Sequence, residues 1–401
     1  MVEEVEEQGV TPKLRFPEFQ GASKWKVKPL DDICNFLNNR RKPISSSDRE
    51  RGVYRYYGAS GIVDYVKDFI FNERLLLIGE DGAKWGGFEK TAFIVEGKYW
   101  VNNHAHVIKT QGINDSLLEN YINMLDLGPY VTGAAPPKLT LGKLKTVPVP
   151  VPESTKEQQK IADCLSSLDE LITAQTQKLN ALKTHKKGLM QQLFPAEGET
   201  VPKLRFPEFR EAGEWDFQPL GVLAENLDNR RIPVTGGDRV RGKIPYYGAS
   251  GIVDYVNNFI FDEDLLCISE DGANLVARTS PIAFSISGKT WVNNHAHVLR
   301  FKNSATQKLV EDYLNSVSLE DFLTGMAQPK LNKAMLDAIP IPMPEKDQEQ
   351  EKIANCLFSI DEKITAQVQK IQSLKTHKKG LMQQLFPVLD EVLPPPTATA
   401  P

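Results

Sequence analysis

The stretch YYGASGIVDYV occupies residues 56–66 and appears again, unchanged, at residues 246–256. Other stretches recur at nearly the same separation: PKLRFPEF at 12–19 and 202–209, WVNNHAHV at 100–107 and 291–298, and LKTHKKGLMQQLFP at 182–195 and 374–387. A repeat of about 190 residues that occurs only twice is too long for the unit of a solenoid, so it indicates the duplication of a whole domain-sized segment. The chain therefore consists of two similar halves.

The composition is that of an ordinary soluble protein. A length of 401 residues suffices for two or three domains, and 41% of the residues are hydrophobic. The net charge of −4 provides no overall attraction to nucleic acid, so any anion-binding surface must come from local clusters of cations. No apolar run is long enough for a membrane helix, and the acidic N-terminus does not resemble a signal peptide. None of the four cysteines has a zinc-binding spacing. We expect a cytoplasmic protein with reduced thiols.

Two long helices are predicted, over residues 153–195 and 345–387. In each one, apolar residues recur at alternating steps of four and three over more than four heptads, which is the pattern of a coiled coil. Ser154 with Glu157, and Asp347 with Gln350, have the spacing of a capping box at the helix start. A lone helix with such an apolar seam would aggregate, so we expect the two helices to pack on each other. The alternative is that each helix packs on its own domain.

The remainder of each half, residues 12–152 and 196–344, is predicted to be a mixed α/β domain. Short strand-like runs such as LLLIGED alternate with Gly, Asn and Pro turns, and one helical stretch comes late in each half, at 116–125 and 307–317. The pattern does not indicate regular alternation of strand and helix. Residues 1–11 and the Pro-, Ala- and Thr-rich residues 388–401 are predicted to be disordered.

The stretch WVNNHAHV is a candidate for chemistry. If it forms one strand, it places four side chains on one face: Trp100, Asn102, His104 and His106. Such a row suits hydrogen bonds to base edges and phosphates. Two histidines at this spacing can also bind a metal, with Glu80 and Asp81 as further ligands. As a third possibility, the histidines are hydrogen-bonded inside the domain.

Paired arginines follow one another in NNRRKP (38–43) and DNRRIP (228–233). Arginine binds phosphates and guanine edges in a bidentate manner, although a solvated surface is equally consistent with these residues. The small residues of YYGASG permit close approach of a ligand to the backbone. The chain contains no Walker loop, no dinucleotide-binding fingerprint and no GxSxG motif. The sequence therefore offers no recognisable active site.

Taken together and in this order, these stretches resemble the specificity (S) subunit of type I restriction-modification systems. The likeness covers nearly the whole chain, and it includes AQPKLN (327–332) followed by IPIPMP (339–344), and the closing QQLFP (383–387). One departure is Pro136, which stands where the second half has Gln328.

The resemblance implies a mixed α/β fold in which two target-recognition domains are separated by two long helices in an antiparallel coiled coil, with a pseudo-twofold internal duplication. It also implies a chain without a catalytic site or cofactor of its own. Such a subunit binds double-stranded DNA, holds two methyltransferase (M) subunits, which use S-adenosylmethionine, and recruits restriction/translocase (R) subunits.

We expect DNA contacts from polar and aromatic residues of the duplicated stretches and their neighbours. In the first half these are Arg40, Arg41, Tyr57, Ser60, Lys84, Asn102, Asn103, His104 and Lys138. In the second half they are Arg230, Arg231, Tyr247, Ser250, Asn274, Asn293, Asn294, His295, Gln328 and Lys330. Because the two halves share most of these residues, a target of two half-sites close to an inverted repeat is expected. The most different segments, 83–91 and 273–281, are expected to read asymmetric bases.

Three other functions are considered. A metal-dependent nuclease would use four acidic and histidine residues in each half, namely Glu80, Asp81, His104 and His106, and Glu270, Asp271, His295 and His297. A coiled-coil scaffold would bind no DNA even in its complex. A specificity component of another DNA-modification or phage-defence system would have the same architecture.

Overall fold

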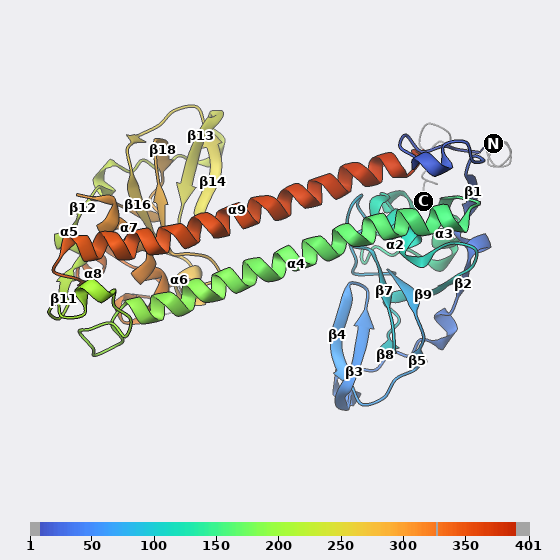
Figure 1. Ribbon diagram of the computed structural model, residues 1–401, viewed down its shortest axis with the longest axis horizontal. Coiled ribbons are helices and arrows are strands. Elements are labelled where there is room, and N and C mark those ends of the chain that lie inside the picture. Colours follow the sequence, from blue (N-terminus) through green and yellow to red (C-terminus); the bar gives the residue numbers. More distant parts are fainter. Residues whose placement is uncertain (1–8, 326–327, 390–401) are drawn as a thin grey trace. The chain divides into compact units, whose positions relative to one another are not determined.

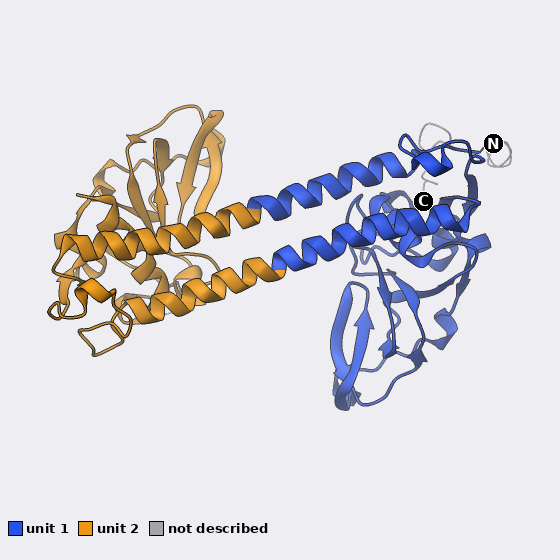
Figure 2. Ribbon diagram, viewed as in Figure 1, with its two compact units in different colours: residues 1–176, 369–401 blue, residues 177–368 orange. Residues whose placement is uncertain are grey.

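The computed structural model describes residues 9–325 and 328–389, and it divides into two compact units. Unit 1 contains residues 1–176 and 369–401, and unit 2 contains residues 177–368 (Figure 2). The boundaries cut through both long helices. Each unit therefore joins one globular domain with the first part of one helix and the last part of the other.

The globular domain of unit 1 is mixed α/β, as predicted (Figure 1). Its strands are β1 (Lys26–Pro29), β2 (Cys34–Phe36), β3 (Arg51–Gly58), β4 (Gly61–Val66), β5 (Phe71–Asn72), β6 (Leu75–Gly79), β7 (Ala92–Val95), β8 (Lys98–Val101), β9 (Ala105–Thr110) and β10 (Pro148–Val151). Its helices are α2 (Asp115–Met124), α3 (Leu141–Lys145) and the start of α4 (Thr155–Leu193). The strands form two four-stranded sheets, β2-β9-β6-β7 and β4-β3-β8-β5, and the pair β1-β10. All strand pairs are antiparallel except β3 with β8.

Unit 2 repeats this order of strands. They are β11 (Asp216–Pro219), β12 (Ala224–Asn226), β13 (Arg241–Gly248), β14 (Gly251–Val256), β15 (Phe261–Asp262), β16 (Leu265–Ser269), β17 (Ala283–Ile286), β18 (Lys289–Val292), β19 (Ala296–Phe301) and β20 (Pro340–Met343). The helices are α5 (Leu220–Leu223), α6 (Asn274–Ala277), α7 (Ser304–Ser316), α8 (Lys333–Asp337) and α9 (Asp347–Leu385). Its sheets, β12-β19-β16-β17 and β14-β13-β18-β15, have the same connectivity as those of unit 1.

The central strand β6 explains why the sequence LLLIG is apolar without alternation. Leu76 and Ile78 belong to the hydrophobic cluster on the helix side of the sheet, whereas Leu75 and Leu77 belong to the cluster shared with the second sheet. Because successive side chains point to opposite faces, a strand between two cores must be apolar at every position. Strand β16 of unit 2 divides its residues between two clusters in the same way.

The repeated stretch YYGASGIVDYV is a β-hairpin in both units. In unit 1 it joins β3 to β4, with Tyr57 opposite Ile62 and Gly58 opposite Gly61, and unit 2 has the same register. Gly61 has a φ of +128°, which a residue with a side chain rarely adopts. Identity in this stretch therefore preserves a turn geometry.

In each unit the two long-helix segments run antiparallel. In unit 1, Ile161 of α4 and Leu385 of α9 lie in one hydrophobic cluster, and Lys378 forms an ion pair with Asp169 at 2.6 Å. Unit 2 is organised in the same way, with Lys186 and Asp361 paired at 2.7 Å. Residues early in α4 therefore contact residues late in α9. This is the antiparallel order that was expected.

The starts of the two helices differ from the capping boxes that were predicted. Ser154 accepts a hydrogen bond from the Glu157 N–H at 3.4 Å, as expected, but the Glu157 carboxylate does not return to the Ser154 backbone. It binds Arg15 instead, at 2.6 Å. The prediction for α9 was wrong, because the helix begins at Asp347 itself and the Gln350 amide donates to the Pro344 carbonyl.

The repeated PKLRFPEF segment binds both helices within one unit. In unit 1 the Arg15 guanidinium bonds both oxygens of Glu157 in α4, and the Leu14 N–H donates to the Gln384 carbonyl of α9 at 2.9 Å. Unit 2 repeats this with Arg205 on Glu349, at the start of α9, and with Leu204 on Gln192 at the end of α4. The segment thus fastens the start of one helix to the end of the other.

WVNNHAHV does not form the single strand under which its four side chains would share a face. Strand β8 ends at Val101 and β9 begins at Ala105, with a turn between them. The Asn102 side chain stabilises the turn by accepting a hydrogen bond from the His104 N–H at 2.8 Å. His104 and His106 therefore do not share a face: the His104 side chain is 51% exposed, and His106 is fully buried.

The termini predicted to be disordered lie mostly outside the described residues. Two described residues in these ranges are ordered in the core of unit 1: Val10 forms a β-bridge with Trp25, and Leu389 joins the hydrophobic cluster. Within residues 9–325 and 328–389, none of the helices combines the length and the hydropathy needed to span a membrane.

Prediction: Glu157→Ala should strongly destabilise the protein. The Glu157 side chain is 1% exposed and the Arg15 side chain 8% exposed, so the substitution leaves a buried guanidinium without its partner. We expect the free energy of unfolding in urea to fall by about 3–5 kcal/mol. The control is Glu153→Ala, which breaks an exposed ion pair with Lys26 and should cost far less, because solvent screens that pair. Equal losses for the two variants would contradict a supporting role for Arg15 and Glu157.

Candidate nucleic-acid interface

Four duplicated stretches converge at one place in each domain. In unit 1 this place is formed by four segments: the turn after β3, the loop after β6, the turn before β9 and the segment around Lys138. The Glu80 N–H bonds the His104 carbonyl, and the Leu139 N–H bonds the Glu80 carbonyl, both at 2.8 Å. A side chain at Gly79 would lie 2.4 Å from the Ala83 Cβ and 2.9 Å from the Ala59 carbonyl. In unit 2 the equivalent residue is Ser269, whose hydroxyl donates a hydrogen bond to the Ala249 carbonyl. We call this group of loops the loop cluster.

An ion-pair network organises the loop cluster of unit 1. Glu80 pairs with Arg41 at 2.5 Å and with Lys138 at 2.9 Å, and Asp81 pairs with His104. Burial alone would raise the pKa of Glu80, but its bonds to Arg41 and Lys138 outweigh this effect and hold the pKa below its ordinary value. Glu80 is therefore ionised at neutral pH and orients the two cations.

Unit 2 contains the same network with the equivalent residues. Glu270 pairs with Arg231 at 2.6 Å and with Lys330 at 3.1 Å, and Asp271 pairs with His295 at 2.9 Å. The pKa of Glu270 is likewise lowered, since the contacts with Arg231, His297 and Lys330 outweigh its burial. The duplicated sequence thus builds one arrangement of charges twice.

Beneath each network lies a buried histidine whose partner differs between the units. In unit 1 the His106 Nδ1 faces the Asn38 amide at 2.8 Å, and in unit 2 the His297 Nδ1 faces the Asp228 carboxylate at 2.6 Å. Burial lowers the pKa of His106. Burial would raise the pKa of Asp228, but the hydrogen bond with His297 outweighs it and lowers that pKa.

Asp228, Glu270 and His297 form one group of potential metal ligands in the described chain, with donor atoms within 4.8 Å of one another. Both ring nitrogens of His297 are already hydrogen-bonded, since Nε2 lies 2.7 Å from the Leu331 carbonyl. Arg231 and Lys330 also form ion pairs with Glu270. A divalent cation would have to displace these positive charges, so the group fits an ion-pair network better than a metal site. The ligand sets considered for a nuclease do not form such a group among the described residues.

The structure places some predicted contact residues together on the surface of the loop cluster. In unit 1 the exposed or half-exposed residues are Ser60, Lys84, Asn103, His104 and Lys138. In unit 2 they are Ser250, Asn294, His295, Gln328 and Lys330, with Asn274 half-buried. These side chains are accessible to a ligand.

Other predicted residues have structural roles. Tyr57, Asn102 and Asn293 are buried, and Tyr247 is half-buried with its ring stacked on Phe284. Arg41 and Arg231 are mostly buried, and each also donates to two carbonyls of the turn before β9 or β19.

Arg40 and Arg230 lie outside the loop cluster. Arg40 pairs with Glu73 at 2.8 Å, and its guanidinium lies over the Phe71 ring, beside β5. Arg230 repeats these contacts with Glu263 and Phe261.

The segment that differs most between the units borders the loop cluster. In unit 1 it carries the exposed Lys84, and the Trp85 indole N–H donates to the Gly79 carbonyl at 3.2 Å. In unit 2 the Asn274 side chain donates a hydrogen bond to the Ser280 carbonyl and accepts one from the Ser280 N–H. These bonds shape the loop that contains α6. Thus the same network stands beside different side chains in the two units.

Sequence reasoning missed the charged residues around the Lys186 side chain. Lys186 bonds Asp312 at 2.7 Å and Asp361, and Lys308 also bonds Asp361. The only signal was a lysine at a heptad position where an apolar residue is usual, which indicates a buried partner for its charge.

The match to a known family is consistent with this duplicated architecture. A model of the type I restriction modification DNA specificity domain matches residues 22–184 and, a second time, residues 212–376. The protein thus carries two DNA specificity domains, and together they account for most of its length. The chain belongs to the family of type I restriction-modification DNA specificity subunits.

Similar proteins agree with this assignment. A type I restriction enzyme specificity subunit from Haemophilus influenzae is 38% identical over 144 residues, which is 35% of this chain and 37% of that protein's length. The MjaVIII specificity subunit of Methanocaldococcus jannaschii is 23% identical over 431 residues, covering 93% of both chains. The crystal structure of an S subunit from M. genitalium has a TM-score of 0.65 at 14% identity, covering 94% of this chain and 100% of that one, which shows a shared fold.

Prediction: Asn38→Asp should raise the pKa of His106. The folded-state pKa of His106 is lowered, so its contribution to stability is present above the unfolded value of about 6.5 and is lost as pH falls below it. A carboxylate at position 38 favours the charged imidazole, and unit 2 shows that Asp228 fits there. We expect NMR titration of His106 to show a higher pKa than in the wild type, and a smaller loss of stability as pH falls below about 6.5.

The control is Asp228→Asn, which changes the equivalent position of unit 2 and should leave the titration of His106 unchanged. An unchanged titration of His106 in Asn38→Asp would show that the residue at position 38 does not control its charge.

Proposed function

We propose that this specificity subunit is a non-catalytic protein that reads a bipartite DNA target, each half-site contacting the loop cluster of one domain. The observation that carries the proposal is the construction of one charge network in both units, Glu80 with Arg41 and Lys138, and Glu270 with Arg231 and Lys330. A duplicated site suits a duplex whose half-sites are related by inversion.

The exposed cations and amides of the loop cluster suit DNA. Lys138 and Lys330 have side chains 41% and 52% exposed, and each keeps donors for a phosphate beyond its bond to glutamate. Asn103, Asn294 and Gln328 can bond base edges, as can the exposed His104 and His295. We propose these residues, with Ser60, Ser250, Lys84 and Asn274, as the DNA-contact set. Tyr57, Tyr247, Asn102, Asn293, Arg41 and Arg231 support it from below.

We further propose that catalysis comes from partner subunits. Two methyltransferase subunits would supply S-adenosylmethionine chemistry, and restriction/translocase subunits would join them, in the cytoplasm. The acidic and histidine side chains that a nuclease would need are engaged with arginine, lysine and backbone groups in this chain. These contacts support a binding role for the chain.

Prediction: Lys138→Ala and Lys330→Ala should each weaken DNA binding by the methyltransferase complex and reduce its salt dependence. The loss of one phosphate contact makes the fall of log K with log salt concentration less steep, by about 1 in the slope. The control is Lys178→Ala, at an exposed position of α4, for which the slope should not change. Titration of a labelled duplex at several salt concentrations measures the slopes. If all three variants keep the wild-type slope, these lysines do not contact phosphates.

Prediction: replacing residues 273–281 with the segment AKWGGFEKT from 83–91 should make the methylated site more symmetric. The two loop clusters differ most in this segment, and a good bidentate base contact discriminates by about 1–3 kcal/mol, so a few side chains suffice to change a base preference. Sequencing of methylated DNA from cells that carry the variant and the methyltransferase gives the site. An unchanged target would place the determinants of asymmetry elsewhere.

A further inference from the structure

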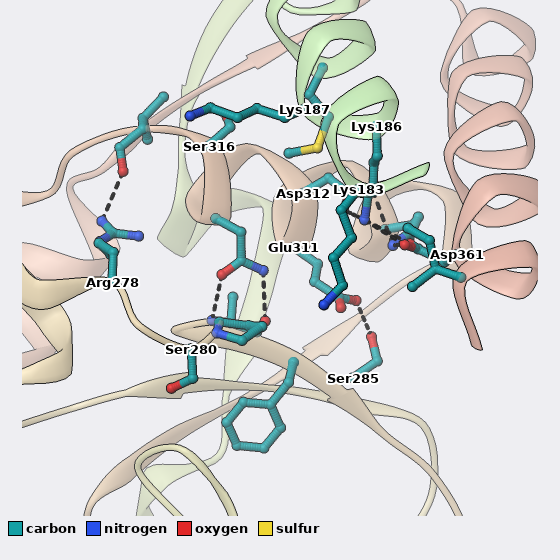
Figure 3. A pocket seen from close by; sticks show the side chains of 18 of the residues that line it. Lys183, Lys186, Lys187, Arg278, Ser280, Ser285, Glu311, Asp312, Ser316 and Asp361 are labelled. Carbon is teal, nitrogen blue, oxygen red and sulfur yellow. Dashed lines mark hydrogen bonds and ion pairs between the residues drawn. The ribbon is translucent and has the colours of Figure 1, made fainter. Parts of the chain in front are cut away.

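Unit 2 contains a cleft of about 1070 Å³, which Figure 3 shows from close by. The ion-paired residues of the loop cluster are not among the residues that line it. Its walls come from the last turns of α4, from α7, from the segment 275–285 and from the middle of α9. All of these elements belong to unit 2. Nothing in the DNA-reading role of the chain accounts for this cleft.

Unit 1 shows what fills the matching space in the other copy. There the repeat-equivalent positions hold Trp85 and Phe88, which pack against the hydrophobic core, and the Lys379 ammonium lies 4.4 Å from the centre of the Phe88 ring. In unit 2 these positions hold Leu275 and Arg278. Unit 2 thus lacks both aromatic rings: Leu275 is buried in the core, Arg278 bonds backbone carbonyls, and Lys187, the counterpart of Lys379, lines the cleft.

The wall of the cleft also gains an aromatic side chain. Phe358 of α9 lines it and is 53% exposed, whereas the repeat-equivalent residue of unit 1 is Ser166. Val276, which is 48% exposed, lies on the wall as well. Apolar side chains that remain exposed beside a cavity are typical of a surface that another molecule covers.

The cleft carries positive charge that the chain does not neutralise. Lys183 and Lys187 are exposed, and neither forms an ion pair with any residue in the described part of the chain. Arg278 donates to the carbonyls of Leu275, Leu314 and Val317, and burial lowers its pKa.

Five cations and four acidic side chains line the cleft, and the exposed Glu320 is one of these acids. Asp312 and Asp361 are bound by Lys186 and Lys308. Burial raises the pKa of Glu311, which accepts a hydrogen bond from Ser285. Figure 3 shows Lys186 beside Asp361, Lys187 at the top of the view, and the Lys183 side chain running down toward Glu311.

We propose that this cleft binds a segment of a second protein that presents an aromatic side chain next to carboxylates. The aromatic ring would occupy the space that Trp85 and Phe88 fill in unit 1, and the carboxylates would pair with Lys183 and Lys187. A polypeptide segment is favoured over a small ligand because the volume reaches the upper end of the range for drug-sized ligands, about 300–1,000 Å³. One such segment binds per chain, because unit 1 covers the equivalent place with its own residues.

The test measures the binding of a fluorescent synthetic peptide, with Phe and Trp flanked by Asp and Glu, to the full-length chain by fluorescence anisotropy. We expect saturable binding with one site per chain. Lys183→Glu should weaken it by about tenfold or more, because attraction becomes repulsion. Phe358→Ser should weaken it as well. Replacing 273–281 with AKWGGFEKT should abolish it, because the aromatic rings that the segment carries in unit 1 then fill the cleft.

Two controls separate this site from general charge attraction. Lys375→Glu changes the unit 1 counterpart of Lys183 and should leave binding unchanged, and a peptide with Ala in place of Phe and Trp should not bind. Circular dichroism establishes that each variant is folded, and Phe358→Ser replaces an exposed residue, so it tests the site without disturbing the core. The proposal is overturned if the acidic aromatic peptide does not bind, if the peptide without aromatic residues binds equally well, or if Lys183→Glu and Phe358→Ser bind as the wild type does.

Discussion

Each globular domain completes its hydrophobic core with the far end of a helix that begins in the other unit, and the rest of the structure depends on this exchange. In unit 1 the last turn of α9 inserts Leu385 and Phe386, and the Phe386 ring lies 5.4 Å from the Tyr121 ring. In unit 2 the last turn of α4 inserts Leu193 and Phe194, with Phe194 at 5.6 Å from Tyr313. Without these residues each core would expose apolar surface to water, and the insertion favours the antiparallel order of the helix segments within each unit.

The duplicated stretches fall into two groups with distinct physical purposes. PKLRFPEF and QQLFP fasten the helix exchange through the buried Arg15 and Arg205 ion pairs and through the core phenylalanines. The hairpin, the loop after β6 and the turn before β9 build the loop cluster, where Glu80 orients two cations. The variable segments 83–91 and 273–281 lie between these groups, beside the loop cluster and against the helices. A change there alters the surface beside the loop cluster, and it also alters the packing on the core, because Trp85, Phe88 and Leu275 contact it.

Much of the fold could be predicted from the sequence, because heptads and repeats are local patterns. The heptads located both long helices, and the repeats predicted two similar mixed α/β domains. The alternation in WVNNHAHV did not reveal that two strands and a turn lie there, because it does not show that the Asn102 side chain accepts a hydrogen bond from the His104 N–H. The pairing of His106 with Asn38, and the cleft of unit 2, depend on residues far apart in the sequence that only the fold brings together. Arg40 and Arg41 are adjacent in the sequence and were expected to act together. In the structure they pair with different residues, Glu73 and Glu80 respectively.

The central claim is that two copies of one loop cluster read two related half-sites. The most direct measurement maps every methylated adenine in a genome whose host expresses this chain with its methyltransferase partner. We predict one bipartite target, two short half-sites separated by unspecified bases, in which most positions match under inversion. A continuous target, or half-sites that share no bases under inversion, would contradict the claim and assign the loop cluster a purely structural role.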